Sequence, residues 1–170
     1  MRKRIILFRH GKSDWQANFQ TDHERPLSKR GEKAARTMGN YLLRIDSVPE
    51  YALTSSALRA RMTLELAAAT GWDTRSEVSD ALYAATPDNV LQEIQGIAPA
   101  YTTAILVGHN PTWSELTSLL LGGGEFDLST AAMVCVDFEV DTWLEVSYGE
   151  GALVWLQRPK MIEKLLAASA

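Results

Sequence analysis

The chain has 170 residues, of which 46% are hydrophobic and 22% are charged, and its formal net charge is −4 at pH 7. This length allows one domain with a sizeable core but not two full domains, and the composition disfavours a disordered chain. The single cysteine excludes an internal disulfide and a cysteine-based zinc site, while the mild acidity disfavours general binding to nucleic acids or anionic membranes. We therefore expect a single globular domain over residues 1–170.

The N-terminus begins with basic residues at positions 2–4, as a signal peptide would. The apolar run that follows covers only residues 5–8 before Arg9 and His10 interrupt it, whereas a signal peptide needs roughly 7–15 apolar residues. The sequence also lacks an apolar run of the roughly 20 residues that a transmembrane helix needs. These features predict a cytoplasmic protein whose first strand begins near residue 4.

Short apolar runs alternate along the chain with longer amphipathic stretches, which is typical of a mostly parallel sheet covered by helices. Helix starts are indicated by Ser28, by Ser55 and Ser56, and by Pro87, because serine favours the N-cap and proline the first turn. In chain order the pattern predicts a strand at 4–9, a helix from Ser28 that stops before Pro49, a strand at 51–54, a helix from Ser55 or Ser56 to Gly71, a helix from Pro87, a strand at 103–107, a helix after Pro111 that ends at Gly122, strands near 132–138 and 151–156, and a terminal helix at 160–168.

Unusual polar residues follow the carboxyl ends of three predicted strands, in segments 9–11, 55–59 and 108–111. Ligands of open α/β sheets bind outside this edge of the sheet, and the last two segments also begin helices, whose N-termini favour anions. The sequence therefore predicts that two histidines and two arginines converge on one edge, namely His10, His109, Arg9 and Arg59.

This group of residues has the chemistry of an oxyanion site. Arginine presents a planar fork of donors that matches phosphate, and a histidine held through one ring nitrogen can attack phosphorus through the other. Either histidine alone is more often structural, so the prediction of covalent phosphoryl transfer depends on the coincidence of all four residues.

Four motifs in this order resemble those of the histidine phosphatase superfamily, also called phosphoglycerate mutase-like. They are Arg9-His10-Gly11, the Arg-Pro-Leu-Ser…Gly pattern at 25–31, the segment at 55–63, and Gly108-His109-Asn110-Pro111. The segment at 55–63 has Ser56 where the family commonly has proline. The resemblance covers most of the chain and implies a three-layer α/β/α fold.

The resemblance also implies residue roles. His10 would be the transiently phosphorylated nucleophile, Arg9 and Arg59 would bind phosphoryl oxygens, and His109 would donate a hydrogen bond to them. Arg61 lies two positions from Arg59 and cannot share its helix face, so we expect it to be a solvated surface charge.

The sequence defines the roles of other residues near the motifs less closely. Arg25 either reaches the phosphate or ties down the long loop that precedes it. Ser13 could contact phosphate, although a plain loop role is favoured for it and for Lys12. His23 has no motif partner and is interpreted as a surface histidine. No metal or cofactor is expected, because no spacing of His, Asp and Glu fits a ligand set and the arginines already supply positive charge.

The short length and the motif spacing resemble the SixA-like group of bacterial phosphohistidine phosphatases. Family members with alcohol substrates commonly use a carboxylic acid as proton donor, and one group has an aspartate where this chain has Asn110. Glu77, Asp80 and Asp88 are the remaining candidates, but none lies in a convincing motif. Because imidazole leaves more readily than an alkoxide, a weak or missing acid favours a phosphohistidine substrate.

Two alternatives stay open at this point: a phosphatase for a small-molecule phosphate ester, and a non-catalytic phosphate-binding protein. The expected partner is a phosphorylated substrate, such as a histidine-phosphotransfer protein. Trp15, Phe19, Tyr83 and Trp113 either line the rim of the pocket or pack in the core. The terminal helix at 160–168 packs on its own domain or on a second subunit, and the oligomeric state is not predicted.

Overall fold

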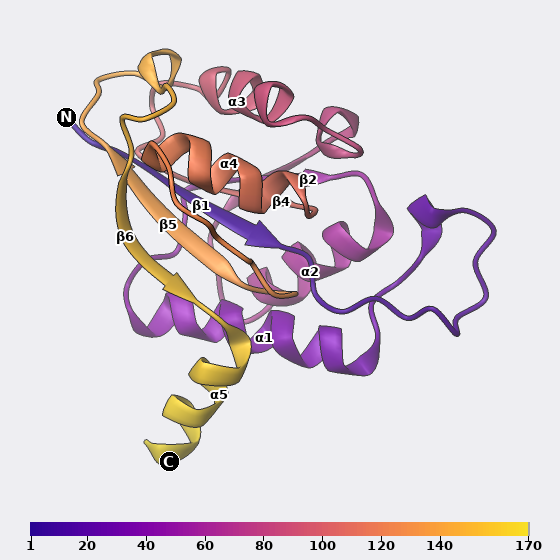
Figure 1. Cartoon of the computed structure of the whole chain (residues 1–170). Helices are drawn as coiled ribbons and strands as arrows, with labels where there is room; N and C mark the ends of the chain where they lie inside the picture. The colour runs from indigo at the N-terminus through magenta and orange to yellow at the C-terminus, as the bar shows by residue number, and fades with distance from the viewer. Residues whose placement is uncertain (170) are drawn as a thin grey trace.

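The computed structural model describes residues 1–169 and contains one six-stranded sheet in the order β3-β2-β4-β1-β5-β6 (Figure 1). Strands β1, β2, β3 and β4 run parallel to one another, whereas β5 runs antiparallel to both of its neighbours, β1 and β6. The strand bounds are Lys3–Arg9 for β1, Tyr51–Ser55 for β2, Arg75–Ser79 for β3, Thr103–Gly108 for β4, Met133–Phe138 for β5 and Ala152–Gln157 for β6. The predicted α/β fold with a mostly parallel central sheet is confirmed.

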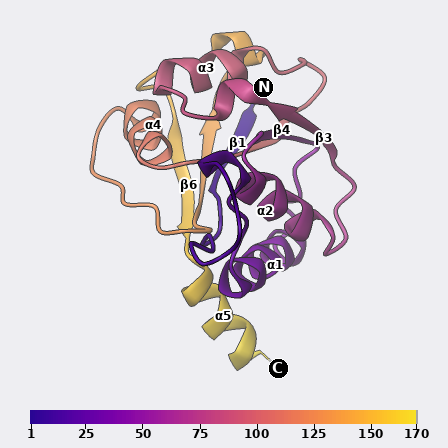
Figure 2. The ribbon, with the colours of Figure 1, turned by 90° about the vertical axis from the view of Figure 1, so that its right-hand side faces the viewer.

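Helices cover both faces of the sheet (Figures 1 and 2). Their bounds are Lys29–Arg44 for α1, Leu58–Ala68 for α2, Pro87–Gln95 for α3, Thr112–Leu121 for α4 and Pro159–Ala168 for α5. Helices α1, α2 and α5 lie on one face, and α3 and α4 lie on the other. The terminal helix packs on its own chain, since Ile162 is buried in the same core as residues of α1 and α2. Within residues 1–169, no helix is both long enough and apolar enough to cross a membrane.

The central strand β1 explains why the sheet has a core on each side. Its apolar side chains alternate between the two faces: Ile5 and Leu7 pack beneath α3 and α4, while Ile6 and Phe8 pack against α1, α2 and α5. All four are at most 1% exposed. A continuous apolar run is thus required, because both faces of a covered parallel strand are buried.

Two helix starts differ in how they are capped. Ser28 caps α1 as predicted, since its Oγ accepts a hydrogen bond from the backbone N–H of Gly31 at 3.1 Å. The prediction that Ser55 or Ser56 caps α2 is wrong, because Ala57 holds the N-cap position and no side chain caps it. The two serine hydroxyls instead lie within hydrogen-bond distance of histidine rings.

The parallel register brings the three polar segments together. Arg9 at the end of β1 is paired with Gly108 at the end of β4, and Thr54 of β2 is paired with Val107 of β4. The chain therefore leaves all three strands at the same edge of the sheet, where ligands of α/β proteins bind.

The turn after β1 passes closely over the start of α1. A Cβ on Gly11 would lie 2.8 Å from the carbonyl oxygen of Gly31, and a Cβ on Gly31 would lie 2.2 Å from that of Lys12. Only glycine fits at these two positions, because a side chain at either would force the backbones apart. This close contact holds the turn after His10 against the first helix.

Candidate active site

A pocket of about 620 Å³ lies at the carboxyl ends of β1, β2 and β4. The side chains that line it are mostly cationic or hydrogen-bond donors, with a single carboxylate among them. The lining residues are Arg9, His10, Lys12, Ser13, Trp15, Asp22, Arg25, Arg30, Arg59, Tyr83, Ala84, His109, Asn110 and Thr130. The structure thus brings together the four residues on which the predicted phosphoryl chemistry depends.

His10 is buried and held through one ring nitrogen. Its Nδ1 lies 2.6 Å from the carbonyl oxygen of Gly11. Since a carbonyl oxygen only accepts, Nδ1 carries the hydrogen and Nε2 of the neutral ring keeps its lone pair. Burial, together with the charges of the neighbouring arginines, lowers the pKa of His10 to about 4 against the opposing effect of the Gly11 hydrogen bond. His10 is therefore an uncharged imidazole at neutral pH, as a nucleophile must be.

His109 lies beside His10, with the two ring centroids 5.1 Å apart. Its Nε2 is 2.8 Å from the hydroxyl oxygen of Ser55, while its buried Nδ1 has no hydrogen-bond partner among residues 1–169. When Ser55 donates to Nε2, Nδ1 bears the hydrogen and can donate to a substrate oxygen. Burial, followed by the positive charge that His10 carries once it is protonated, lowers the pKa of His109 to about 3.

Arg9 and Arg59 enter the pocket from β1 and α2. The Nη1 of Arg9 donates to the carbonyl oxygen of Leu128 at 2.8 Å, while its buried Nε has no hydrogen-bond partner among residues 1–169. Arg59 is 5% exposed, and its backbone oxygen accepts a bond from Thr63 Oγ1, which in turn accepts from the N–H of Gly11 at 3.0 Å. This chain of hydrogen bonds fixes Arg59 relative to the turn that carries His10.

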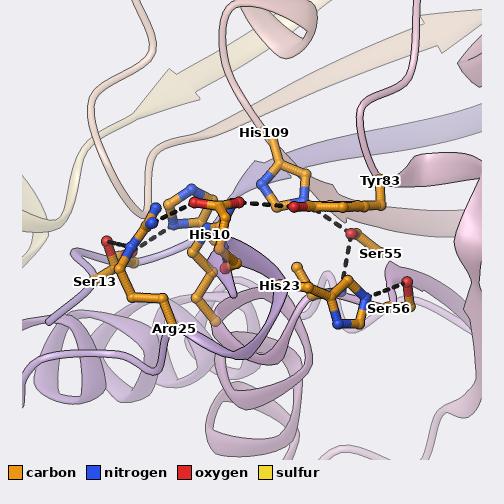
Figure 3. A network of polar contacts seen from close by, with 12 residues as sticks. His10, Ser13, His23, Arg25, Ser55, Ser56, Tyr83 and His109 are labelled. Atoms are coloured by element: carbon orange, nitrogen blue, oxygen red, sulfur yellow. Dashed lines mark hydrogen bonds and ion pairs between the residues drawn. The ribbon is translucent and has the colours of Figure 1, made fainter. Parts of the chain in front are cut away.

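Asp22 is the pocket carboxylate that the sequence analysis missed. Its Oδ2 accepts from Arg59 Nη2 at 3.0 Å and from the Tyr83 hydroxyl at 2.8 Å, and its Oδ1 accepts from Arg25 Nη1. Two of these donors, Tyr83 and Arg25, are labelled in Figure 3. Burial alone would raise the pKa of Asp22, but the hydrogen bonds from Tyr83, Arg25 and Arg59 outweigh it and hold the pKa at about 2. The Asp22 carboxylate thus lies between Arg25 and Arg59, where a bound anion would be paired with the same two side chains. No sequence motif marked it, since its contacts arise only when the loop folds back.

Arg25 both lines the pocket and holds the loop at 12–27. Its Nε donates to Ser13 Oγ at 2.9 Å, and its guanidinium carbon lies 3.7 Å from the centroid of the Trp15 ring. Phe19 lies further away, with its centroid 6.0 Å from the same carbon. The two roles weighed for Arg25 are therefore compatible in this geometry, and Ser13 contacts the arginine as well as the pocket.

The other aromatic residues divide between rim and core. Tyr83 lines the pocket and packs edge-on against His109, with centroids 5.8 Å apart. Trp113 is fully buried beneath β4, where a Cβ on Gly108 would lie 2.1 Å from its ring. Of the two roles considered for Trp113, the structure shows packing in the core.

Two interpretations of single residues need correction. His23 is not an unpartnered surface histidine: its Nε2 lies 2.9 Å from Ser56 Oγ, and its ring packs edge-on against Tyr83 at 4.8 Å. Arg61 is half-buried rather than fully solvated, because its Nε donates to the carbonyl oxygen of Ser56 at 3.2 Å. Neither residue lines the pocket.

The three candidate proton donors lie outside the pocket. Glu77 is on the exposed edge strand β3, where it accepts from the Tyr51 hydroxyl. Asp88 at the start of α3 accepts from the Tyr148 hydroxyl at 2.6 Å, and Asp80 is exposed in a 3₁₀ turn after β3. Across residues 1–169, no three His, Cys, Asp or Glu side chains are grouped so that they could hold a metal ion.

Comparison with known proteins gives the same family as the motifs. The sequence profile of the histidine phosphatase superfamily (branch 1) matches residues 5–83. An uncharacterised protein of Mycobacterium tuberculosis is 33% identical over 161 residues, which cover 89% of this chain and 99% of that protein. The chain belongs to the histidine phosphatase superfamily. The expectation of a histidine-type phosphatase is confirmed at this level.

Solved structures confirm the fold of this histidine phosphatase. The structure of the protein histidine phosphatase SixA complexed with tungstate has a TM-score of 0.81 and 24% identity, and the match covers 94% of this chain and 99% of that one. The native structure of the mycobacterial glucosyl-3-phosphoglycerate phosphatase has a TM-score of 0.67 and 15% identity, with 91% and 98% covered. At these identities the likeness concerns the fold and not the substrate.

Proposed function

We propose that this protein hydrolyses phosphohistidine on a protein substrate through a covalent phospho-His10 intermediate. The observation that carries the proposal is a neutral His10, held at Nδ1 by Gly11, beside a cluster of arginine and histidine donors. This arrangement combines an uncharged nucleophile with the positive groups that stabilise a transferring phosphoryl group.

In the first step, the phosphoryl group takes the place of the Asp22 carboxylate between Arg59 and Arg25. Nε2 of His10 attacks the phosphorus of a phosphohistidine whose other ring nitrogen carries a proton. The bond from phosphorus to the substrate nitrogen breaks, that nitrogen keeps the electron pair, and the substrate histidine leaves as neutral imidazole. Arg9, Arg59 and His109 donate hydrogen bonds to the phosphoryl oxygens as their charge develops. In the second step, water attacks the phosphorus of phospho-His10, which releases inorganic phosphate and restores the neutral imidazole.

The ionisation state of the pocket carboxylate supports a phosphohistidine substrate. Asp22 is the sole carboxylate lining the pocket within residues 1–169, and its pKa of about 2 leaves it ionised at neutral pH. An ionised carboxylate cannot protonate a leaving group. An imidazole leaving group, whose conjugate acid has a pKa of about 6.5, tolerates this far better than an alkoxide does.

A small phosphate ester is the second candidate substrate. The pocket volume of about 620 Å³ lies within the range of small-molecule sites, which is about 300–1,000 Å³. The fold is also shared with a glucosyl-3-phosphoglycerate phosphatase. A non-catalytic phosphate-binding protein is the third candidate, but it would not need the neutral, oriented His10.

The test is phosphate release by the purified protein, without added metal, from a phosphohistidine peptide, a phosphoserine peptide and a panel of small esters. We expect preference for phosphohistidine and an acid-labile phosphoenzyme trapped by rapid quenching into alkali. His10→Ala should lose both turnover and labelling, whereas His23→Gln should still form the labelled enzyme. Efficient turnover of a small ester without turnover of phosphohistidine would overturn the substrate assignment.

A further inference from the structure

A second cavity, of about 380 Å³, adjoins the active-site pocket. The two share Lys12, Arg30 and Thr130 as lining residues, and the second continues past Arg158 to Lys160 at the start of α5. We refer to this second cavity as the basic groove. A substrate whose phosphoryl group is at His10 can therefore extend along the basic groove without leaving the protein surface.

The charges of the basic groove are not balanced by the protein itself. Four cationic side chains line it, and within residues 1–169 none of them has a carboxylate oxygen within 4.0 Å. Glu163 is the one lining carboxylate, and it is paired with Lys33 at 4.0 Å. In a chain with a net charge of −4, such a local excess of positive charge favours an anionic ligand.

The rim of the active-site pocket favours a protein ligand over a small one. Trp15 lines the pocket and is 66% exposed, although its ring stacks on the buried Arg25. Exposed tryptophan beside arginine is characteristic of protein–protein contact sites. The groove cations lie on long flexible side chains, which suit carboxylates carried at several positions of a polypeptide.

We propose that the basic groove binds acidic side chains flanking the phosphohistidine of a protein substrate. This inference rests on the proposed function and adds a sequence preference to it. Each carboxylate–cation pair at such an exposed surface contributes little, so the preference comes from several pairs and weakens with salt.

The experiment compares two phosphohistidine peptides of equal length, one with glutamate on both sides of the histidine and one with glutamine. We expect kcat/KM to be about fivefold to tenfold higher for the glutamate peptide at low ionic strength, with most of the difference lost at 0.5 M salt. Lys160→Gln should lower this ratio about twofold, and Arg158→Gln combined with Lys160→Gln should lower it further. Lys164→Gln, on the same helix but outside the groove, is the matched control and should keep the full ratio.

The outcomes separate this inference from the proposed function. Equal turnover of the two peptides would overturn the groove assignment while the phosphohistidine activity stands. Failure to hydrolyse either peptide, together with turnover of small esters, would overturn the proposed function. A Lys160-dependent preference for a small bisphosphate over its monophosphate, with no preference among peptides, would show a small-molecule subsite and overturn the assignment to acidic side chains.

Discussion

The strand ends and the loop at 12–27 contribute to one pocket in different ways. The segments that carry His10, Arg59 and His109 are fixed by the sheet register, by backbone bonds and by a glycine contact to α1. The loop contributes Asp22 and Arg25, which are held mainly by side-chain contacts with each other and with Arg59. The position of His10 is therefore preorganised, whereas the position of the loop depends on ion pairs within the loop and with Arg59.

The difference also concerns charge. The strand ends and α2 bring cations and neutral histidines together. The loop adds Asp22, the one lining carboxylate within residues 1–169, which pairs with Arg59 and with Arg25. In the proposed mechanism the phosphoryl group takes the same donors as Asp22, so the loop loses part of its contacts when substrate binds. Substitutions in the two regions should therefore have different consequences.

The largest effect is expected from Arg59→Ala on α2. Loss of a fixed donor to the developing phosphoryl charge should lower kcat/KM by about 10²–10³-fold. Arg59→Lys should recover only part of this loss, because an ammonium group cannot replace the planar fork. Arg61→Ala is the control on the same helix and should stay within about twofold of the wild type; a similar loss in both variants would show a general disturbance of α2.

The second prediction concerns stability against pH. The folded-state pKa of His10 is about 4, below the roughly 6.5 of an unfolded histidine. Between these values the unfolded chain binds the proton and the native chain does not, so the free energy of unfolding falls as the pH drops from 6.5 toward 4 and is constant above 6.5.

For His10 this loss is about 3 kcal/mol, and His109, with a pKa of about 3, acts in the same direction. Urea unfolding at pH 4.5 and pH 7.5 measures the loss. His10→Gln should make the stability less dependent on pH over this range. An unchanged pH dependence in the variant would show that His10 does not carry it.

A smaller effect is expected from Arg25→Ala in the loop. It removes one phosphate donor and the stacking on Trp15, so kcat/KM should fall about tenfold, with KM carrying most of the change. Limited proteolysis should cut residues 12–27 faster in the variant. A loss as large as that of Arg59→Ala would show that Arg25 contributes as much to turnover as Arg59 does. It would contradict the expected difference between the loop and the strand ends.

The smallest expected effect is a gain. Asp22→Asn removes the carboxylate that competes for Arg25 and Arg59, so inorganic phosphate or tungstate should inhibit the variant about threefold to tenfold more strongly. Asp14→Asn, in the same loop but outside the pocket, is the matched control. Weaker oxyanion binding by Asp22→Asn would show that the carboxylate mainly positions the arginines.

The sequence determined most of the framework. Buried parallel strands need continuous apolar runs and glycines where backbones touch, so β1, β2, β4 and the helix order were predictable from pattern alone. The convergence of His10, Arg59 and His109 followed as well, because the carboxyl ends of adjacent parallel strands share one edge. The strand β3 was not predicted, since residues 75–79 lie at an exposed edge and carry no apolar signal.

The loop residues that complete the pocket could be identified only from the folded structure. The loop at 12–27 has no periodicity, so its sequence did not reveal that Asp22 reaches Arg59 or that His23 reaches Ser56. The same holds for the exclusion of Asp80 and Asp88 from the pocket, although both lie close in sequence to Tyr83, which lines it. Regular elements repeat a local pattern that the sequence displays, whereas contacts between an irregular loop and distant side chains depend on the folded geometry of both.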